Sequence, residues 1–319
     1  MARSILVVGA GGVGSLLAAR LAHSLKGWEV RLAGRARPSP ASAAHLEAAG
    51  REGIAVEGAE ACRARPRVER GPGGEAASFL LFAVKAGRIA EAAREFLPLA
   101  GPETAAAVLS NGLDVLADFP PAFPRRRLVR GLVGVGAERA GPGRVRQSGE
   151  LTLVLAPAPG EEAGAARALA ALLGEAGIRA EVRPDGREAE WRKAMANAVI
   201  NPAGAALGLR NGDLLERGPA LALLKALAAE AQRVSDAEGF ALEVWALARE
   251  AARATAGNRN SMWQDLLAGR ETEIGEITGR LLRRAEGRGI ALPAHRAMYH
   301  LVRARERRGS RVDTPGPAP

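Results

Sequence analysis

One lysine and two asparagines lie at helical spacing in a segment whose other residues are mostly apolar. In Glu190–Pro202, EWRKAMANAVINP, Lys193, Asn197 and Asn201 follow one another at intervals of four residues. In a helix this spacing places the three polar groups on one stripe about 12 Å long. The stripe predicts a binding surface for a small polar metabolite. In the alternative interpretation, the helix is buried and its amides cap neighbouring backbone.

Lys193 is the best candidate in this sequence for a proton donor. Of the 45 Lys and Arg residues, only those at positions 26, 85, 193 and 225 are lysines. The pKa of a lysine shifts readily on burial, whereas Arg stays protonated near neutral pH. The four histidines lie outside the suspected ligand loops, and the sequence contains no H-E-x-x-H, C-x-x-C or G-x-S-x-G motif. We therefore expect proton transfer by Lys193 and no metal site.

The composition excludes several classes of protein. With 47% apolar and 25% charged residues, the chain resembles a globular protein of enzyme size. Its net charge of +10 favours anionic ligands, but the basic C-terminal end lacks interleaved aromatic residues, so we expect no nucleic-acid partner. A single cysteine, Cys62, fits a reducing compartment, and no uncharged run reaches the ~18 residues of a membrane span. We expect a soluble, cytoplasmic protein without a membrane partner.

A glycine-rich loop near the N-terminus predicts a dinucleotide site. The run Ser4–Val8 reads as a strand and Ser15–Leu25 as a helix, and G-x-G-x-x-G lies between them. In this context the glycines permit a tight turn and close approach of a pyrophosphate to the helix N-terminus. The expected cofactor-binding residues of this loop are Gly9, Gly11, Gly12, Val13 and Gly14.

The end of the next expected strand, Glu29–Ala33, discriminates between cofactors. An NAD site usually places Asp or Glu there, but this chain continues Gly34-Arg35-Ala36-Arg37. A guanidinium suits a 2′-phosphate, so Arg35 predicts NADPH, and whether Arg35 or Arg37 dominates stays open. The alternative is a solvated arginine in an arginine-rich chain.

Two later strand ends also carry polar residues. Phe79–Val84 is a continuous apolar run that ends in Lys85, and Ala105–Leu109 is followed by Ser110 and Asn111. The carboxyl edge of an open α/β sheet is where such folds bind ligands, so Lys85 and Asn111 are site candidates.

The expected secondary structure changes near residue 184, where strands give way to helices. We predict a Rossmann-type α/β domain at residues 1–184, an all-α domain at 185–312 and a disordered tail at 313–319. Before the boundary, residues 38–58 read as a loop with a short helix, 63–74 as a polar connection and 141–149 as turns. The remaining expected strands are Leu128–Val135, Leu151–Leu155 and Ala180–Arg183. The expected later helices are Glu190–Ile200, Gly218–Glu238, Ala241–Thr255, Thr272–Gly287 and Pro293–Arg307, with Pro202 ending or kinking the first of them.

Four motifs in the second half complete a recognisable pattern. They are W-R-K-x-x-x-N-x-x-x-N-P at Trp191–Pro202, Asn211-Gly212, S-M-x-Q-D at Ser261–Asp265 and T-E-I at Thr272–Ile274. Together with the glycine loop, and in this order, they resemble the ketopantoate reductase (2-dehydropantoate 2-reductase) family. Locally, Asn260 or Ser261 also reads as a helix N-cap, and Glu273 as a structural carboxylate.

The resemblance implies NADPH-dependent reduction of 2-dehydropantoate to (R)-pantoate, on the route to pantothenate and coenzyme A. It places Lys193 and Glu273 at the catalytic centre, as proton donor and substrate-binding carboxylate. The implied substrate contacts are Asn111, Asn197, Asn201, Asn258 and Ser261, and the implied cofactor contacts beyond the glycine loop are Arg35, Lys85 and Asn111.

Two other functions stay open at this point. A related NADPH-dependent reductase of another 2-oxo acid would share much of this pattern, and a non-catalytic NADPH-binding regulator would share the glycine loop. We expect a small-molecule substrate and a monomer or homodimer.

Overall fold

The computed structural model describes residues 3–34 and 39–309, and the chain divides into two compact units. The first combines the chain up to Ser110 with Asp114–Gly186; the second combines Asn111–Leu113 with the chain from Arg187 onward. Asn111 therefore belongs by its contacts to the helical unit, although Ser110 before it and Asp114 soon after it belong to the first unit. The predicted tail 313–319 and the arginines at positions 35 and 37 lie outside the described residues.

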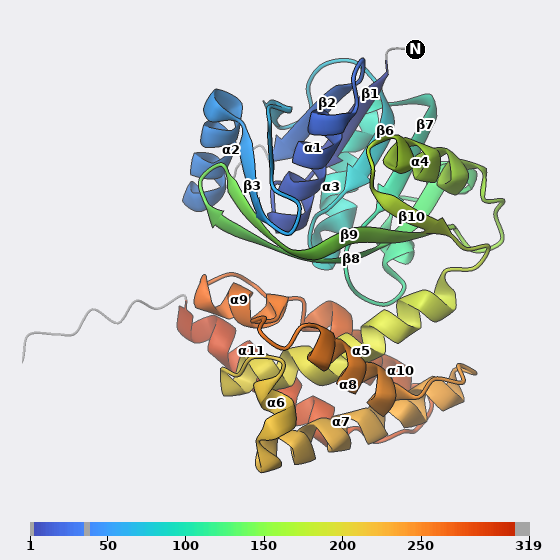
Figure 1. Cartoon of the computed structure of the whole chain (residues 1–319). Coiled ribbons are helices and arrows are strands. Elements are labelled where there is room, and N and C mark those ends of the chain that lie inside the picture. The colour runs from blue at the N-terminus through green and yellow to red at the C-terminus, as the bar shows by residue number, and fades with distance from the viewer. Residues whose placement is uncertain (1–2, 35–38, 310–319) are drawn as a thin grey trace, which may run out of the picture. The chain divides into compact units, whose positions relative to one another are not determined.

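A ten-stranded sheet forms the first unit, in the order β4-β3-β9-β8-β7-β6-β1-β2-β5, with β10 paired to β9 (Figure 1). The strands are β1 Ser4–Val8, β2 Glu29–Gly34, β3 Ile54–Gly58, β4 Cys62–Ala64, β5 Arg67–Arg70, β6 Ala77–Phe82, β7 Ala100–Val108, β8 Leu128–Gly141, β9 Arg144–Pro157 and β10 Arg179–Val182. Strands β5, β2, β1, β6, β7 and β8 pair in parallel, the arrangement of doubly wound dinucleotide folds. The predicted class, an α/β unit followed by a helical one, is confirmed.

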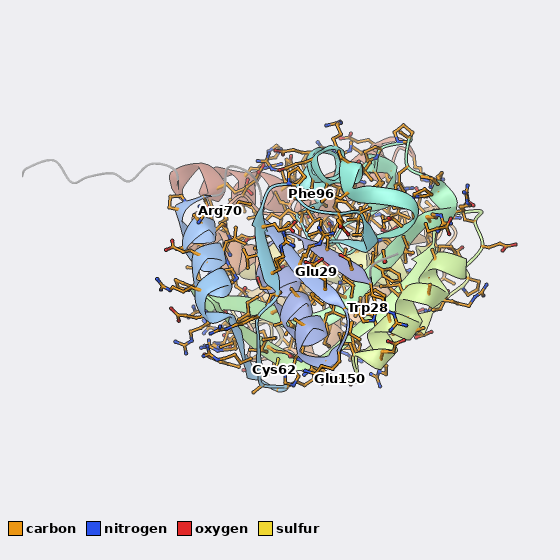
Figure 2. All side chains as sticks on the ribbon, turned by 90° about the horizontal axis from the view of Figure 1, so that it is seen from above. Trp28, Glu29, Cys62, Arg70, Phe96 and Glu150 are labelled. Carbon is orange, nitrogen blue, oxygen red and sulfur yellow. The ribbon has the colours of Figure 1, made fainter. Side chains whose placement is uncertain are left out.

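Both faces of this sheet are covered, which explains its continuous apolar strands. Alternate residues of β1 face two cores: Ile5 and Val7 pack in one, Leu6 and Val8 in the other. The first core lies under α1, and the second lies under α3; Cys62 borders the first and Phe96 fills part of the second (Figure 2). The helices of this unit are α1 Gly12–Ser24, α2 Pro40–Glu52, α3 Ile89–Phe96 and α4 Gly164–Glu175. Helix α1 contacts both β2 and β4, so the sheet curls around it.

Several strands of this sheet were not predicted. Residues 38–58 contain the 13-residue helix α2, capped by Ser39, and then β3, rather than a loop with a short helix. The polar connection 63–74 contains β4 and β5, and the turn-rich 141–149 belongs largely to β8 and β9, each 14 residues long. These segments contain many Glu and Gly residues, whose strand propensity is low. They form strands because they pair with strands that are distant in the sequence, and a local sequence pattern does not predict such pairing.

The described residues of the second unit form helices joined by loops, without a strand. Its helices are α5 Arg187–Leu207, α6 Asp213–Glu216, α7 Gly218–Ala237, α8 Val244–Ala254, α9 Ser261–Leu267, a π-helical turn at Gly275–Gly279, α10 Arg280–Glu286 and α11 Pro293–Gly309. Helix α5 contacts α7, α8, α9, α11 and the π turn, so it is the central element of this unit. Its Trp191 is 2% exposed and stacks on Phe240 with ring centroids 4.8 Å apart. No helix within residues 3–34 and 39–309 has the length and apolarity that a bilayer span requires.

We expected Pro202 to end or kink the first helix of this unit, and the first of these two outcomes, that it ends the helix, is wrong. Helix α5 continues through Pro202 to Leu207 and ends at Gly208, which has φ +66°. An interior proline costs a helix about 3 kcal/mol or more. Here the residues after it, Ala203 and Ala205, are fully buried in the core of the unit, and their packing outweighs that cost.

Candidate active site

Each glycine of the N-terminal loop has a distinct structural role. Gly9 has φ +113°, and a Cβ there would lie 2.6 Å from the carbonyl oxygen of Ala83. A Cβ on Gly14 would collide with the carbonyl oxygen of Gly9, and one on Gly12 with that of Ala137. A Cβ on Gly11 would meet no atom within 4 Å. Three glycines thus permit close packing, whereas Gly11 borders open space.

This open space lies at the N-terminus of α1. Gly11 is the N-cap residue, has no side chain with which to cap, and its carbonyl accepts the first helical hydrogen bond, from Ser15 N–H at 3.0 Å. The N–H groups of the first helical turn have no partner within the helix, and they carry the positive end of its dipole. The loop therefore fits a dinucleotide pyrophosphate, which would take the place that a Cβ on Gly11 would occupy.

Lys85 lies where the sequence places it, just beyond the carboxyl end of β6. It is partly exposed and begins a short 3₁₀ turn, with its carbonyl accepting from Arg88 N–H at 2.8 Å. The neighbouring strand end is fastened to the same segment, because Ser110 Oγ donates to the carbonyl of Val84 at 2.6 Å. The predicted 2′-phosphate contacts at positions 35 and 37 stay predictions, since those residues are not among the described ones.

The polar stripe on α5 runs from partly exposed to buried. Lys193 and Asn197 are partly exposed, whereas Asn201 is 5% exposed. The flanking Met195 and Val199 are fully buried. Packing on these residues holds the helix, so the ammonium and the amides are carried on a rigid element.

Asn111 and Glu273, which are far apart in sequence, are neighbours in the second unit. The amide nitrogen of Asn111 donates to Oε2 of Glu273 at 3.3 Å. The Asn111 segment is fastened to the helical core by Leu113, which is fully buried, and by Arg280, whose guanidinium donates to the Leu113 carbonyl at 2.6 Å. Gly112, with φ +126°, allows the sharp turn between them. The sequence contained no signal for the role of Arg280.

The other two predicted substrate contacts lie near the start of α9. Ser261 is exposed as the first helical residue, and Asn260 Oδ1 caps the helix by accepting from Trp263 N–H at 3.0 Å, one of the two N-caps expected. The backbone of Asn258 is bound at both ends: its carbonyl accepts from Asn211 N–H at 3.1 Å, and its N–H donates to Thr255 at 2.8 Å. The loop is thus held in shape by backbone contacts.

Two elements that carry or follow predicted residues of the second unit contact α5. Helix α9, with Ser261, contacts it, and so does the π turn that follows Glu273. The described residues contain no group of three His, Cys, Asp or Glu side chains that could hold a metal ion.

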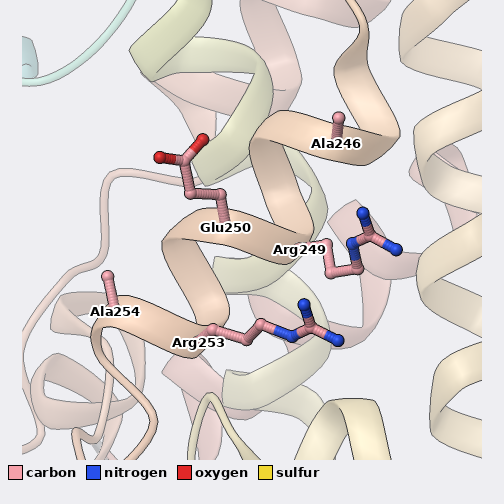
Figure 3. Close-up of a pocket in the computed structure, with 5 residues that line it drawn as sticks. All are labelled: Ala246, Arg249, Glu250, Arg253 and Ala254. Atoms are coloured by element: carbon pink, nitrogen blue, oxygen red, sulfur yellow. The ribbon is translucent and has the colours of Figure 1, made fainter.

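A separate hollow of about 430 Å³ lies along α8 (Figure 3). Arg249 and Arg253, one turn apart, extend to the same side of the helix. None of the predicted site residues lines this hollow, which is formed by Ala246, Arg249, Glu250, Arg253 and Ala254.

Comparison with known proteins returns two adjoining family matches. The family described as "Ketopantoate reductase PanE/ApbA" matches residues 5–160, and its "C terminal" part matches residues 185–306. The chain is 29% identical to the 2-dehydropantoate 2-reductase of Archaeoglobus fulgidus over 95% of this chain and 97% of that protein. It is 32% identical to the enzyme of the same name from Mycobacterium tuberculosis over 95% of this chain and 98% of the relative.

Solved structures show the same relationship. The crystal structure of a PanE/ApbA family ketopantoate reductase from Ralstonia eutropha is 27% identical, with a TM-score of 0.84 over 97% of this chain and 99% of that one. A ternary structure of D-mandelate dehydrogenase with NADH and anilino(oxo)acetate is 24% identical, with a TM-score of 0.85 over 96% and 99%. The second likeness concerns the fold alone.

Proposed function

This chain belongs to the ketopantoate reductase PanE/ApbA family, and we propose that it reduces 2-dehydropantoate to (R)-pantoate with NADPH, in the synthesis of pantothenate and coenzyme A. The observation that carries the proposal is the hydrogen bond between Asn111 and Glu273. Two residues that the family resemblance assigns to the substrate, 162 positions apart, are thereby found side by side on the helical unit that bears Lys193.

The chemistry requires a proton donor and groups that hold the substrate. NADPH supplies the hydride when bound, and reduction of the C2 carbonyl builds negative charge on its oxygen. Lys193 polarises this oxygen and protonates it, a contribution typically worth ~10²–10⁴-fold in rate. Glu273 accepts a hydrogen bond from the substrate hydroxyl, and Ser261 donates one to the substrate carboxylate. Asn197 and Asn201 supply the remaining amide contacts.

The preference for NADPH is proposed from the sequence after β2. Arg35 and Arg37 follow that strand, and no acidic residue stands among residues 34–37. A guanidinium binds a 2′-phosphate through paired hydrogen bonds. The ratio of kcat/KM with NADPH to that with NADH, measured for Arg35→Ala and Arg37→Ala, identifies which arginine sets the preference. A ratio unchanged in both variants contradicts this assignment.

A reductase of a different 2-oxo acid is the second candidate. Its support is that the fold is shared with D-mandelate dehydrogenase, so the architecture does not by itself select the substrate. A non-catalytic NADPH-binding regulator is a weaker alternative, because the lysine and both asparagines of the α5 stripe are present.

One assay separates the three functions. NADPH absorbance is followed with 2-dehydropantoate and a panel of other 2-oxo acids, each over a range of concentrations. The proposal expects the highest kcat/KM for 2-dehydropantoate. A higher value for another acid supports the second candidate, and cofactor binding without oxidation by any acid supports a regulator.

A further inference from the structure

A carboxylate on the last helix holds the residue that precedes Glu273. Glu306, on α11, accepts two hydrogen bonds at the same oxygen, from the backbone N–H of Thr272 at 2.7 Å and from its hydroxyl at 2.6 Å. Thr272 is 3% exposed. Because both the backbone and the side chain of Thr272 are fixed, the starting position of Glu273 is fixed as well.

Thr272 also makes a short turn across Glu273, just before a wider one. Thr272 Oγ1 accepts from Ile274 N–H at 3.2 Å, and Ile274 is fully buried. Gly279 N–H then donates to the Ile274 carbonyl at 2.9 Å, a spacing of five residues that defines a π turn. Short π segments inside helices are frequent at functional sites. Here the wide turn immediately follows the predicted substrate carboxylate.

Helix α11 packs directly against this turn, and two glycines of the turn permit the close contact. A Cβ on Gly275 would lie 2.9 Å from the guanidinium of Arg303, and one on Gly279 would lie 3.3 Å from the ring of Tyr299. Arg303 in turn donates to the second oxygen of Glu306 at 3.0 Å. The three α11 side chains therefore form one network against the segment Thr272–Gly279, which we call the π segment.

We propose that Glu306 is a positioning residue for substrate binding, acting through Thr272 on Glu273. This inference rests on the proposed function, in which Glu273 binds the substrate hydroxyl. Glu273 is then held in two ways: its side chain is bound by Asn111, and the residue before it, Thr272, is bound by Glu306. Hydrogen bonds to a charged carboxylate are strong, and contacts that fix a ligand-binding side chain hold it in the geometry that binding requires.

The kinetic test uses a graded series. Glu306→Ala removes both acceptors, whereas Glu306→Gln keeps one oxygen for Thr272 and loses the charge that pairs with Arg303. Thr272→Val removes the hydroxyl, whereas Thr272→Ser retains it. We expect Glu306→Ala to raise KM for the 2-oxo acid about ten-fold, with KM for NADPH unchanged, and Glu306→Gln and Thr272→Ser to have smaller effects.

A matched control is another glutamate that pairs with an arginine of α11. Glu286 on α10 and Arg296 on α11 form an exposed ion pair at 2.7 Å. Glu286→Gln is expected to leave both KM values unchanged. The discriminating measurement is KM for the 2-oxo acid in a double variant. If Glu306 acts through Glu273, adding Glu306→Ala to Glu273→Gln should cause no further change in this KM. An undiminished effect there overturns the proposal and assigns Glu306 a general structural role.

Amide hydrogen exchange tests the same idea without any activity. Exchange in the π segment should accelerate in Glu306→Ala and stay as in the wild type in Glu286→Gln. If the wild type reduces no 2-oxo acid, the proposed function fails while exchange still decides whether Glu306 orders the π segment. Two results overturn the inference itself. One is unchanged exchange of the π segment in Glu306→Ala; the other is an active wild type whose KM values are unchanged in Glu306→Ala.

Discussion

At the scale of single residues, the proposed reduction depends on polar side chains that differ in their exposure to solvent and in their hydrogen-bond partners. Lys193 and Asn197 are partly exposed on α5, Asn201 is buried, and Glu273 pairs with Asn111 at 3.3 Å. The sequence identified the types and spacing of these residues, because helical periodicity is local. It could not show that Asn111 belongs to the helical unit, since that contact spans 162 positions in the chain.

Replacing Glu273 by Gln tests the substrate contact. The amide keeps the shape of the side chain but weakens acceptance from a substrate hydroxyl, because a charged acceptor makes the stronger hydrogen bond. We expect KM for 2-dehydropantoate to rise about ten-fold in steady-state assays, and KM for NADPH to change less than about two-fold. An equal rise in both constants contradicts a specific role at the substrate.

At the scale of elements, the glycine loop allows a prediction with an internal control. Gly11→Ala places a methyl group in open space, so we expect stability to change by no more than about 0.5 kcal/mol. The same methyl group occupies the position proposed for the pyrophosphate, and NADPH affinity should fall about ten-fold or more. Gly14→Ala forces a Cβ against the Gly9 carbonyl and should destabilise the protein by about 1–3 kcal/mol.

Urea unfolding and NADPH titration of both variants check this pair. Normal NADPH affinity in a folded Gly11→Ala protein would show that the pyrophosphate does not lie over this residue. A fully stable Gly14→Ala protein would contradict the packing role of the third glycine.

The elements that the sequence predicted correctly are those whose signal is local. Strand β1 and helix α1 follow from an apolar run and a glycine motif. Strand β5, by contrast, contains charged residues and forms because it pairs with β2, Arg67 opposite Arg31. The π turn was predicted as part of a continuous helix. Thr272, just before it, is bound by Glu306 of α11, 34 positions later in the chain, and a local sequence pattern does not show such a contact.

At the scale of the whole molecule, one buried histidine couples stability to pH. His45 is 1% exposed; its Nε2 lies 2.9 Å from Ser15 Oγ, and Nδ1 accepts from Gly143 N–H at 3.2 Å. Burial lowers the pKa of His45 below 6.5; the Gly141 carbonyl opposes this shift and the charge of Arg139 adds to it. The unfolded chain therefore binds a proton at a higher pH than the folded one.

The sign of the pH effect follows from this difference. Above about pH 6.5 His45 is neutral in both states and contributes no pH dependence. As the pH falls below that value, His45 gains a proton in the unfolded state before it does so in the folded state. Proton binding therefore favours the unfolded state, and the folded protein loses stability. The urea midpoint should decrease more steeply below pH 6.5 in the wild type than in His45→Gln. Parallel pH profiles for the two proteins contradict this coupling.

The most direct test of the proposed activity is the turnover of Lys193→Ala with NADPH and 2-dehydropantoate. We expect kcat to fall ~10²–10⁴-fold, while the Kd for NADPH, from fluorescence titration, stays within about two-fold of the wild type. Lys225→Ala, which removes an exposed lysine from α7, is the matched control and should retain wild-type turnover. Wild-type turnover in Lys193→Ala would contradict the assignment of this lysine as the proton donor.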